Sequence, residues 1–171
     1  MNGTTPTMTP AANTVSRLST RRQGPEKLAV TIFDHASNAS KAVAYEIARL
    51  IKSRSQAGQP CVLGLATGST PLGVYRELVR LHKMEALSFQ NVVTFNLDEY
   101  YGISHDAAQS YHRFMWENLF SHLDINAANV HIPNGELSLE QLPEYCHSYE
   151  VTVYRSAAPA GKFRRSRSEH R

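Results

Sequence analysis

CVLGLATGSTPLGVYRELV, residues 61–79, decides the fold of this chain. The apolar run over residues 60–66 predicts a buried strand, because short β-branched and apolar runs of this length suit a covered sheet. Pro71, after the cap candidate Thr70, predicts the first position of a helix, where a missing N–H costs nothing. This helix is expected to turn inward Leu72, Tyr75, Leu78 and Val79.

The same order of strand and then helix recurs along the chain. Strands are predicted over residues 28–34, 91–97 and 129–133, and helices over residues 37–58, 110–123 and 137–150, the last broken near Pro143. The first of these helices is opened by Ser37 or Asn38 and closed by Gly58, and its expected buried stripe is Ala39, Val43, Ala44, Ile47, Leu50 and Ile51. Alternating strands and helices favour an α/β fold with a doubly wound, mostly parallel, Rossmann-like sheet.

Charge is distributed unevenly over the 171 residues, which carry a formal net charge of +3. Residues 1–26, rich in Thr, Ser and Pro, are expected to form a disordered leader, with a transit peptide as the alternative, and residues 156–171 a disordered basic tail. Residues 27–155 are expected to form one partial α/β domain. Because acids outnumber bases between residues 26 and 155, by 14 to 10, the sequence argues against a specific nucleic-acid partner.

Other classes of site find little support. The chain has no apolar run long enough for a membrane span and no secretory signal, so a cytoplasmic location without a membrane partner is expected. Cys61 and Cys146 fit neither a disulfide framework nor a zinc site and are expected to be buried thiols. The eight histidines show no metal-ligand spacing, so no metal is expected.

The turn Thr67-Gly68-Ser69-Thr70 joins the strand to the helix at the edge of the sheet where ligands bind. Gly68 lets the backbone approach a ligand closely, and the N–H groups and dipole of a helix start favour an anion, most naturally a phosphate. The loop lacks the Lys of a nucleotide-binding P-loop. The alternative is that a Thr/Ser-rich turn only caps the helix.

The second chemical segment is FNLDEYYG, residues 95–102. Asp98 and Glu99 follow a predicted strand, and a carboxylate in that setting is suited to accept a proton. Two successive residues do not both point into one pocket from a regular strand, so one of the pair is expected to act. The alternative is that one acid caps the next turn while the other is solvated.

Together, LGLATGSTPLGVYREL, VVTFNLDEYYG and SYHRFMWENLF resemble the glucosamine-6-phosphate deaminase (isomerase) family over about residues 28–150. The resemblance implies conversion of glucosamine 6-phosphate to fructose 6-phosphate and ammonia, without cofactor or metal. It implies that Asp98 is the proton base and that Gly68, Ser69 and Thr70 hold the phosphate. Thr67, Glu99 and Tyr100 are assigned supporting roles, and assembly into a homo-oligomer is expected.

The chain departs from the family pattern after residue 150. The family continues with a glycine-rich D-G-H segment that carries the ring-opening His, whereas this chain reads VTVYRSAAPAGKFRRSRSEHR. We therefore expect a truncated or frame-shifted domain that is poorly stable and nearly inactive alone. The alternatives are a non-catalytic sugar-phosphate-binding fragment and a 6-phosphogluconolactonase-like hydrolase. A sugar-sensing repressor is disfavoured, because the leader is too short for a helix-turn-helix segment.

Overall fold

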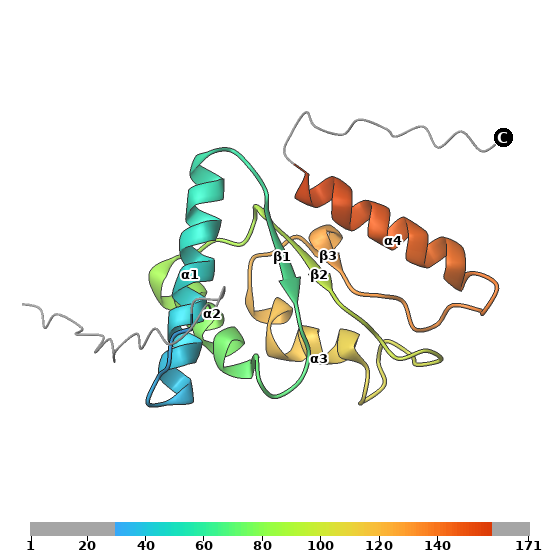
Figure 1. Ribbon diagram of the computed structural model, residues 1–171, viewed down its shortest axis with the longest axis horizontal. Coiled ribbons are helices and arrows are strands. Elements are labelled where there is room, and N and C mark those ends of the chain that lie inside the picture. Colours follow the sequence, from blue (N-terminus) through green and yellow to red (C-terminus); the bar gives the residue numbers. More distant parts are fainter. Residues whose placement is uncertain (1–29, 159–171) are drawn as a thin grey trace, which may run out of the picture.

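The computed structural model describes residues 30–158. Within this range the chain alternates helices and strands, as Figure 1 shows. The elements are α1 (Ala36–Gln56), β1 (Cys61–Leu65), α2 (Leu72–Glu85), β2 (Val92–Asn96), α3 (Tyr111–Asn118), the 3-10 turns η1 (Phe120–His122) and η2 (Ala127–Asn129), β3 (Val130–His131) and α4 (Leu142–Ala157).

The three strands of the described chain form one parallel sheet in the order β1-β2-β3. Leu65 at the end of β1 pairs with Asn96 at the end of β2, and Phe95 pairs with His131 of β3. Helices lie on both sides of this sheet, with α1 and α2 on one side and α4 on the other (Figure 1). The predicted α/β class with a parallel sheet is therefore confirmed.

The core lies between the sheet and the first three helices. It combines alternate residues of the strands, such as Leu63 and Val92, with apolar side chains of α1, α2 and α3. On α1 the buried residues are Ala44, Ala48 and Ile51. The expected stripe is thus wrong at Val43 and Leu50, which are 48% and 43% exposed, because the face of α1 that turns to the core is centred on Ala44, Ala48 and Ile51.

The predicted strand over residues 28–34 is not formed within its described part, residues 30–34. The side chains of Val30 and Ile32 are 61% and 75% exposed. A β-branched run becomes a strand only when its backbone pairs with a neighbour, and no other described strand pairs with residues 30–34. The first element of the described chain is therefore α1, whose N-cap is His35 and not Ser37 or Asn38.

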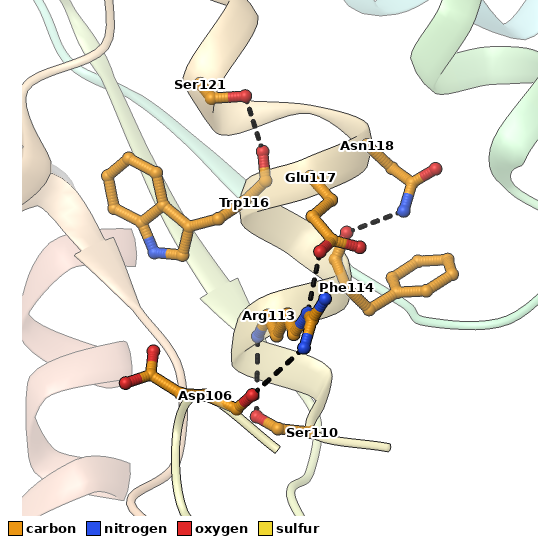
Figure 2. Close-up of polar contacts among 8 residues, drawn as sticks. All are labelled: Asp106, Ser110, Arg113, Phe114, Trp116, Glu117, Asn118 and Ser121. Atoms are coloured by element: carbon orange, nitrogen blue, oxygen red, sulfur yellow. Dashed lines mark hydrogen bonds and ion pairs between the residues drawn. The ribbon is translucent and has the colours of Figure 1, made fainter. Parts of the chain in front are cut away.

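Helix α3 is shorter than the predicted helix over residues 110–123. The hydroxyl of Ser110 caps the helix by accepting the backbone N–H of Arg113. The guanidinium of Arg113 donates to the carboxylate of Glu117 and to the carbonyl of Asp106 (Figure 2). At Leu119 the backbone leaves the helical region, with φ −141° and ψ −67°, and the chain continues as η1. Buried Leu119 and Phe120 both reach the core through this change of direction.

Helix α4 begins later and ends later than predicted. It starts at Leu142, and Pro143 lies in its first turn, where proline fits, so the helix is not broken there. It continues to Ala157 and contains no fully buried residue. Residues 156 and 157, assigned to the tail by composition, are helical. The prediction of two buried thiols holds for Cys61 and is wrong for Cys146, which is exposed on α4.

Candidate functional site

The two segments predicted to carry chemistry end at the same edge of the sheet. The strands β1 and β2 are adjacent and parallel, and Leu65 is the register partner of Asn96. Residues 66–71 follow β1, and residues 97–102 follow β2. The turn and the acidic segment therefore lie next to each other at the carboxyl ends of the strands, where ligands bind in open α/β sheets.

The turn after β1 has the geometry of an open helix N-terminus. Gly68 adopts φ +106°, a conformation that side-chain-bearing residues rarely adopt. Gly68, Ser69 and Thr70 are exposed, and Thr67 is half-buried. Thr70 was predicted to cap the helix, but the N-cap of α2 is Pro71 and no side chain caps it. The first turn of α2 carries no acid, so no carboxylate of that turn offsets the positive end of the helix dipole.

Tyr75 on α2 anchors the start of this turn. Its ring is 2% exposed, and its hydroxyl donates to the carbonyl of Ala66. Burial raises the pKa of Tyr75 to about 12, against the smaller opposing effect of that hydrogen bond. The hydroxyl therefore stays protonated and holds the chain where it leaves β1. Sequence reasoning assigned Tyr75 only to the core and did not foresee this contact.

Glu99 fastens the N-terminus of α3. Its carboxylate accepts the backbone N–H groups of Tyr100, Tyr111 and His112 at 2.9–3.0 Å and the hydroxyl of Ser110 at 2.9 Å. Burial acts to raise the pKa of Glu99, but these four donors outweigh it and hold the pKa below its usual range. The alternative in which one acid caps the next turn is thus correct for Glu99.

Asp98 is the other acid, and it is exposed. It accepts no hydrogen bond and forms no salt bridge with any residue between 30 and 158. Its charge is felt by Tyr111, whose hydroxyl donates to that of Tyr100 at 3.1 Å. The hydrogen bond to Tyr100, burial and the charge of Asp98 together raise the pKa of Tyr111, while the side chain of Thr67 lowers it. Thr67, Asp98, Tyr100 and Tyr111 therefore share one neighbourhood.

A pocket of about 310 Å³ opens beside Asp98. Its walls come from residues 97–101 after β2, residues 133–135 after β3, and the face of α4 that carries Tyr145 and Tyr149. The turn residues 67–70 do not line it. The structure thus brings the turn close to the Asp98 segment and places Asp98 at the border of a cavity that the turn does not line. Sequence reasoning missed this cavity.

Residues 30–158 lack two kinds of feature, a metal-ligand group and a membrane-spanning helix. No three His, Cys, Asp or Glu side chains in this part of the chain gather into a group able to hold a metal ion. None of the helices described has the length and hydropathy that a membrane-spanning segment requires.

Comparison with known proteins identifies the family of this chain. Residues 34–164 match the model of the family of glucosamine-6-phosphate isomerases and 6-phosphogluconolactonases, and the chain belongs to this family.

Two curated relatives that resemble this chain are both glucosamine-6-phosphate deaminases. The chain is 50% identical over 109 residues to the glucosamine-6-phosphate deaminase of Parabacteroides distasonis, covering 64% of this chain and 40% of that protein. It is 45% identical over 120 residues to the glucosamine-6-phosphate deaminase of Phocaeicola vulgatus, covering 70% and 45%. The chain thus spans less than half the length of these curated relatives.

Solved structures show the same likeness. A monomeric glucosamine-6-phosphate deaminase superposes with a TM-score of 0.65 at 43% identity, covering 71% of this chain and 48% of that chain. A 6-phosphogluconolactonase from Thermotoga maritima superposes with a TM-score of 0.56 at 29% identity, covering 70% and 50%.

Proposed function

We propose that this chain carries the phosphate turn and the proton base of a glucosamine-6-phosphate deaminase. The observation that carries the proposal is the register of Leu65 with Asn96, which sets the turn 67–70 beside Asp98 at one edge of the sheet. The relatives that share these segments are glucosamine-6-phosphate deaminases. The substrate in this proposal is a small phosphorylated amino sugar.

Each end of this substrate has a proposed partner. The 6-phosphate lies against the turn and accepts hydrogen bonds from the backbone N–H groups of Gly68 and Ser69 and the hydroxyl of Thr70. These residues are exposed, and no side chain caps the start of α2. Asp98 removes the proton from C2 of the ring-opened sugar and returns it to C1, which turns the amino aldehyde into a ketose imine. Addition of water and loss of ammonia then give fructose 6-phosphate, so the overall reaction consumes water.

The neighbouring side chains support Asp98 in this scheme. Glu99 is held by four donors and positions the segment, so it is unsuited to accept a further proton. Tyr100 and Tyr111 form a hydroxyl pair beside Asp98. Thr67 lies at the junction between this pair and the turn. The proposed chemistry uses protein groups alone, with no metal and no organic cofactor.

The wider setting is also a proposal. Ammonia release from a phosphorylated amino sugar suits amino-sugar catabolism, including the use of N-acetylglucosamine, in the cytoplasm. Assembly into a homo-oligomer remains part of the proposal, because α4 contains no fully buried residue and offers surface for a contact.

Hydrolysis of 6-phosphogluconolactone is the second candidate. The likeness to the Thermotoga maritima lactonase, at 29% identity, favours it. The same turn would hold its phosphate, while Asp98 would activate a water molecule. A chain that binds a sugar phosphate without turnover is the remaining alternative.

Proton exchange at C2 tests the proposal directly. Glucosamine 6-phosphate is incubated with the full chain in D₂O, and NMR follows loss of the C2 hydrogen, while a separate assay follows ammonia. Slow exchange is expected, in keeping with a chain that is expected to be nearly inactive alone, and Asp98→Asn should slow it further, by a factor on the order of 10² to 10⁴. Glu117→Gln, an exposed acid on α3, is the control and should change nothing. Exchange that is undiminished in Asp98→Asn, or absent although the sugar binds, would overturn the proposal.

A further inference from the structure

The pocket beside Asp98 has walls of unusual chemistry. Four tyrosines, Tyr100, Tyr101, Tyr145 and Tyr149, line its volume of about 310 Å³. That volume is at the lower end of the range for ligand pockets, so it suits a small molecule. The turn residues that would hold a phosphate are not part of this wall.

The tyrosine hydroxyls are largely engaged within the protein. Tyr149 donates to the carbonyls of Asn96 and His131, at 2.8 and 3.1 Å. Tyr145 accepts the N–H of Asn134 at 3.0 Å, and Tyr100 accepts from Tyr111. Tyr149 therefore offers a ligand mainly its ring, whereas Tyr100 and Tyr145, which accept in these contacts, offer a ring and a hydroxyl proton. The negative face of an aromatic ring attracts a cation.

The charged groups in the wall are all acidic. Asp98, Glu99 and Glu150 line the pocket, and no Lys, Arg or His does. Glu99 already accepts four hydrogen bonds, whereas Asp98 and Glu150 have no hydrogen-bond or ion-pair partner among residues 30–158. Two carboxylates in the wall are therefore available to a ligand.

The sequence around the pocket is acidic between two arginines, Arg113 on α3 and Arg155 in the last turn of α4. Residues 114–154 contain no Lys or Arg, and their six acids are Glu117, Asp124, Glu136, Glu140, Glu144 and Glu150. Nearby like charges raise the free energy of any anion in the pocket and lower that of a cation. A phosphate ester is thus disfavoured here and favoured at the turn.

We propose that this pocket, which borders the proposed deaminase site and shares Asp98 with it, binds the protonated amino group of a small organic amine. The ammonium group lies between the carboxylates of Asp98 and Glu150, and the apolar body of the ligand packs on the tyrosine rings. Because the wall holds the ligand by charge and aromatic contact, a neutral ligand of the same shape binds more weakly. This site does not require that the chain turn over a sugar phosphate.

Cys146 supplies a direct test, because its exposed thiol lines the pocket while the other cysteine, Cys61, is 1% exposed. The full chain is treated with cationic trimethylammonioethyl or anionic sulfonatoethyl methanethiosulfonate. In each case the thiolate forms a mixed disulfide and releases methanesulfinate. Relative to free cysteine, the cationic reagent is expected to be favoured by about tenfold. Peptide mass analysis assigns the label to Cys146.

Ligand binding is measured by protection and by calorimetry. Glucosamine, at a pH where its amine is protonated, should slow the labelling of Cys146, whereas N-acetylglucosamine, a neutral relative with the same ring, should not. Glu150→Gln should weaken glucosamine binding by about three- to fivefold. Glu144→Gln, on the same helix but outside the wall, is the matched control and should leave binding unchanged.

The outcomes separate this proposal from the proposed function. Equal preference for the two reagents, equal protection by both sugars, or equal effects of Glu150→Gln and Glu144→Gln would overturn the amine site. Loss of C2 exchange in Asp98→Asn would still support the deaminase base in that case. Conversely, an amine site that binds glucosamine in a chain without C2 exchange would leave this proposal standing.

Discussion

The hydroxyl of Tyr149 on α4 donates to the backbone carbonyl of Asn96, the last residue of β2, at 2.8 Å. The same ring lies edge-on to Phe95, with centroids 5.8 Å apart. Since α4 has no fully buried residue, these contacts carry much of its attachment to the sheet. They also shape one wall of the pocket beside Asp98.

Tyr149→Phe should therefore loosen α4 while keeping the ring. Loss of the hydroxyl leaves the Asn96 carbonyl without this donor, so the free energy of unfolding should fall by about 1 kcal/mol. Urea unfolding measures the change, and amide hydrogen exchange should show faster opening in α4. Tyr154→Phe, on the same helix but 70% exposed, is the control. Equal stability of the two variants would contradict this account.

Gly68→Ala tests the backbone of the proposed phosphate turn. Nothing lies within 4 Å of an added Cβ at Gly68, so the cost comes from the φ of +106° and not from crowding. The variant should lose about 1 to 2 kcal/mol of folding free energy or shift the turn, and it should bind inorganic phosphate more weakly. Gly64→Ala, in β1 with equally open space and no positive φ, is the matched control. Comparable phosphate affinity in both variants would argue against a role for this conformation.

Glu99→Gln should change how stability depends on pH. The folded pKa of Glu99 lies below the unfolded value, so its contribution is present above the unfolded pKa of about 4.5 and is lost as pH falls through the folded pKa. The variant should be less stable at pH 7 by about 1 to 3 kcal/mol, because charged acceptors bind backbone N–H groups most strongly. Denaturant midpoints between pH 3 and pH 7 measure both effects. A parallel pH profile for the variant would refute the assignment.

Tyr75→Phe should act at the opposite end of the pH scale. Burial raises the pKa of Tyr75 to about 12, so its protonated form favours folding below pH 10, and this stabilisation is lost as pH rises through about 12. Ultraviolet titration of the folded chain should show a late tyrosine component that the variant lacks. Tyr149, whose pKa burial also raises, should contribute a second late component in both proteins. A tyrosine titration identical in the two proteins would contradict the burial of the Tyr75 hydroxyl.

The segment over residues 61–85 could be predicted from the sequence because its signals are local. A short apolar run, a glycine turn and Pro71 specify β1, the turn and α2 to within a residue or two. Residues 30–34 carry an equally good strand pattern but form no strand, since pairing depends on a partner that no local pattern contains. The exposure of Cys146 likewise depends on how α4 packs.

The sequence predicted that the turn and the acidic segment would meet at one edge of the sheet, but it did not predict what each side chain contacts there. Local pattern left the roles of Asp98 and Glu99 undecided, and only resemblance favoured Asp98. Three of the four donors to Glu99 lie eleven to thirteen residues further along the chain, at Ser110, Tyr111 and His112. No sequence spacing rule predicts these contacts. The tyrosine pocket was missed because its walls come from three separate segments.

The hydrogen bonds of Glu99 also affect how far the loop over residues 101–109 can change in length. One carboxylate ties Tyr100 to the start of α3, so residues 101–109 form a loop whose two ends are joined at a single point. The entropy of closing such a loop grows slowly with its length, by about 0.6 kcal/mol for each doubling. Insertions beyond Ile103, past the hydrogen bond that Gly102 donates to Gly135, should therefore be tolerated without displacing Asp98, which makes that part of the loop a suitable place to graft new specificity.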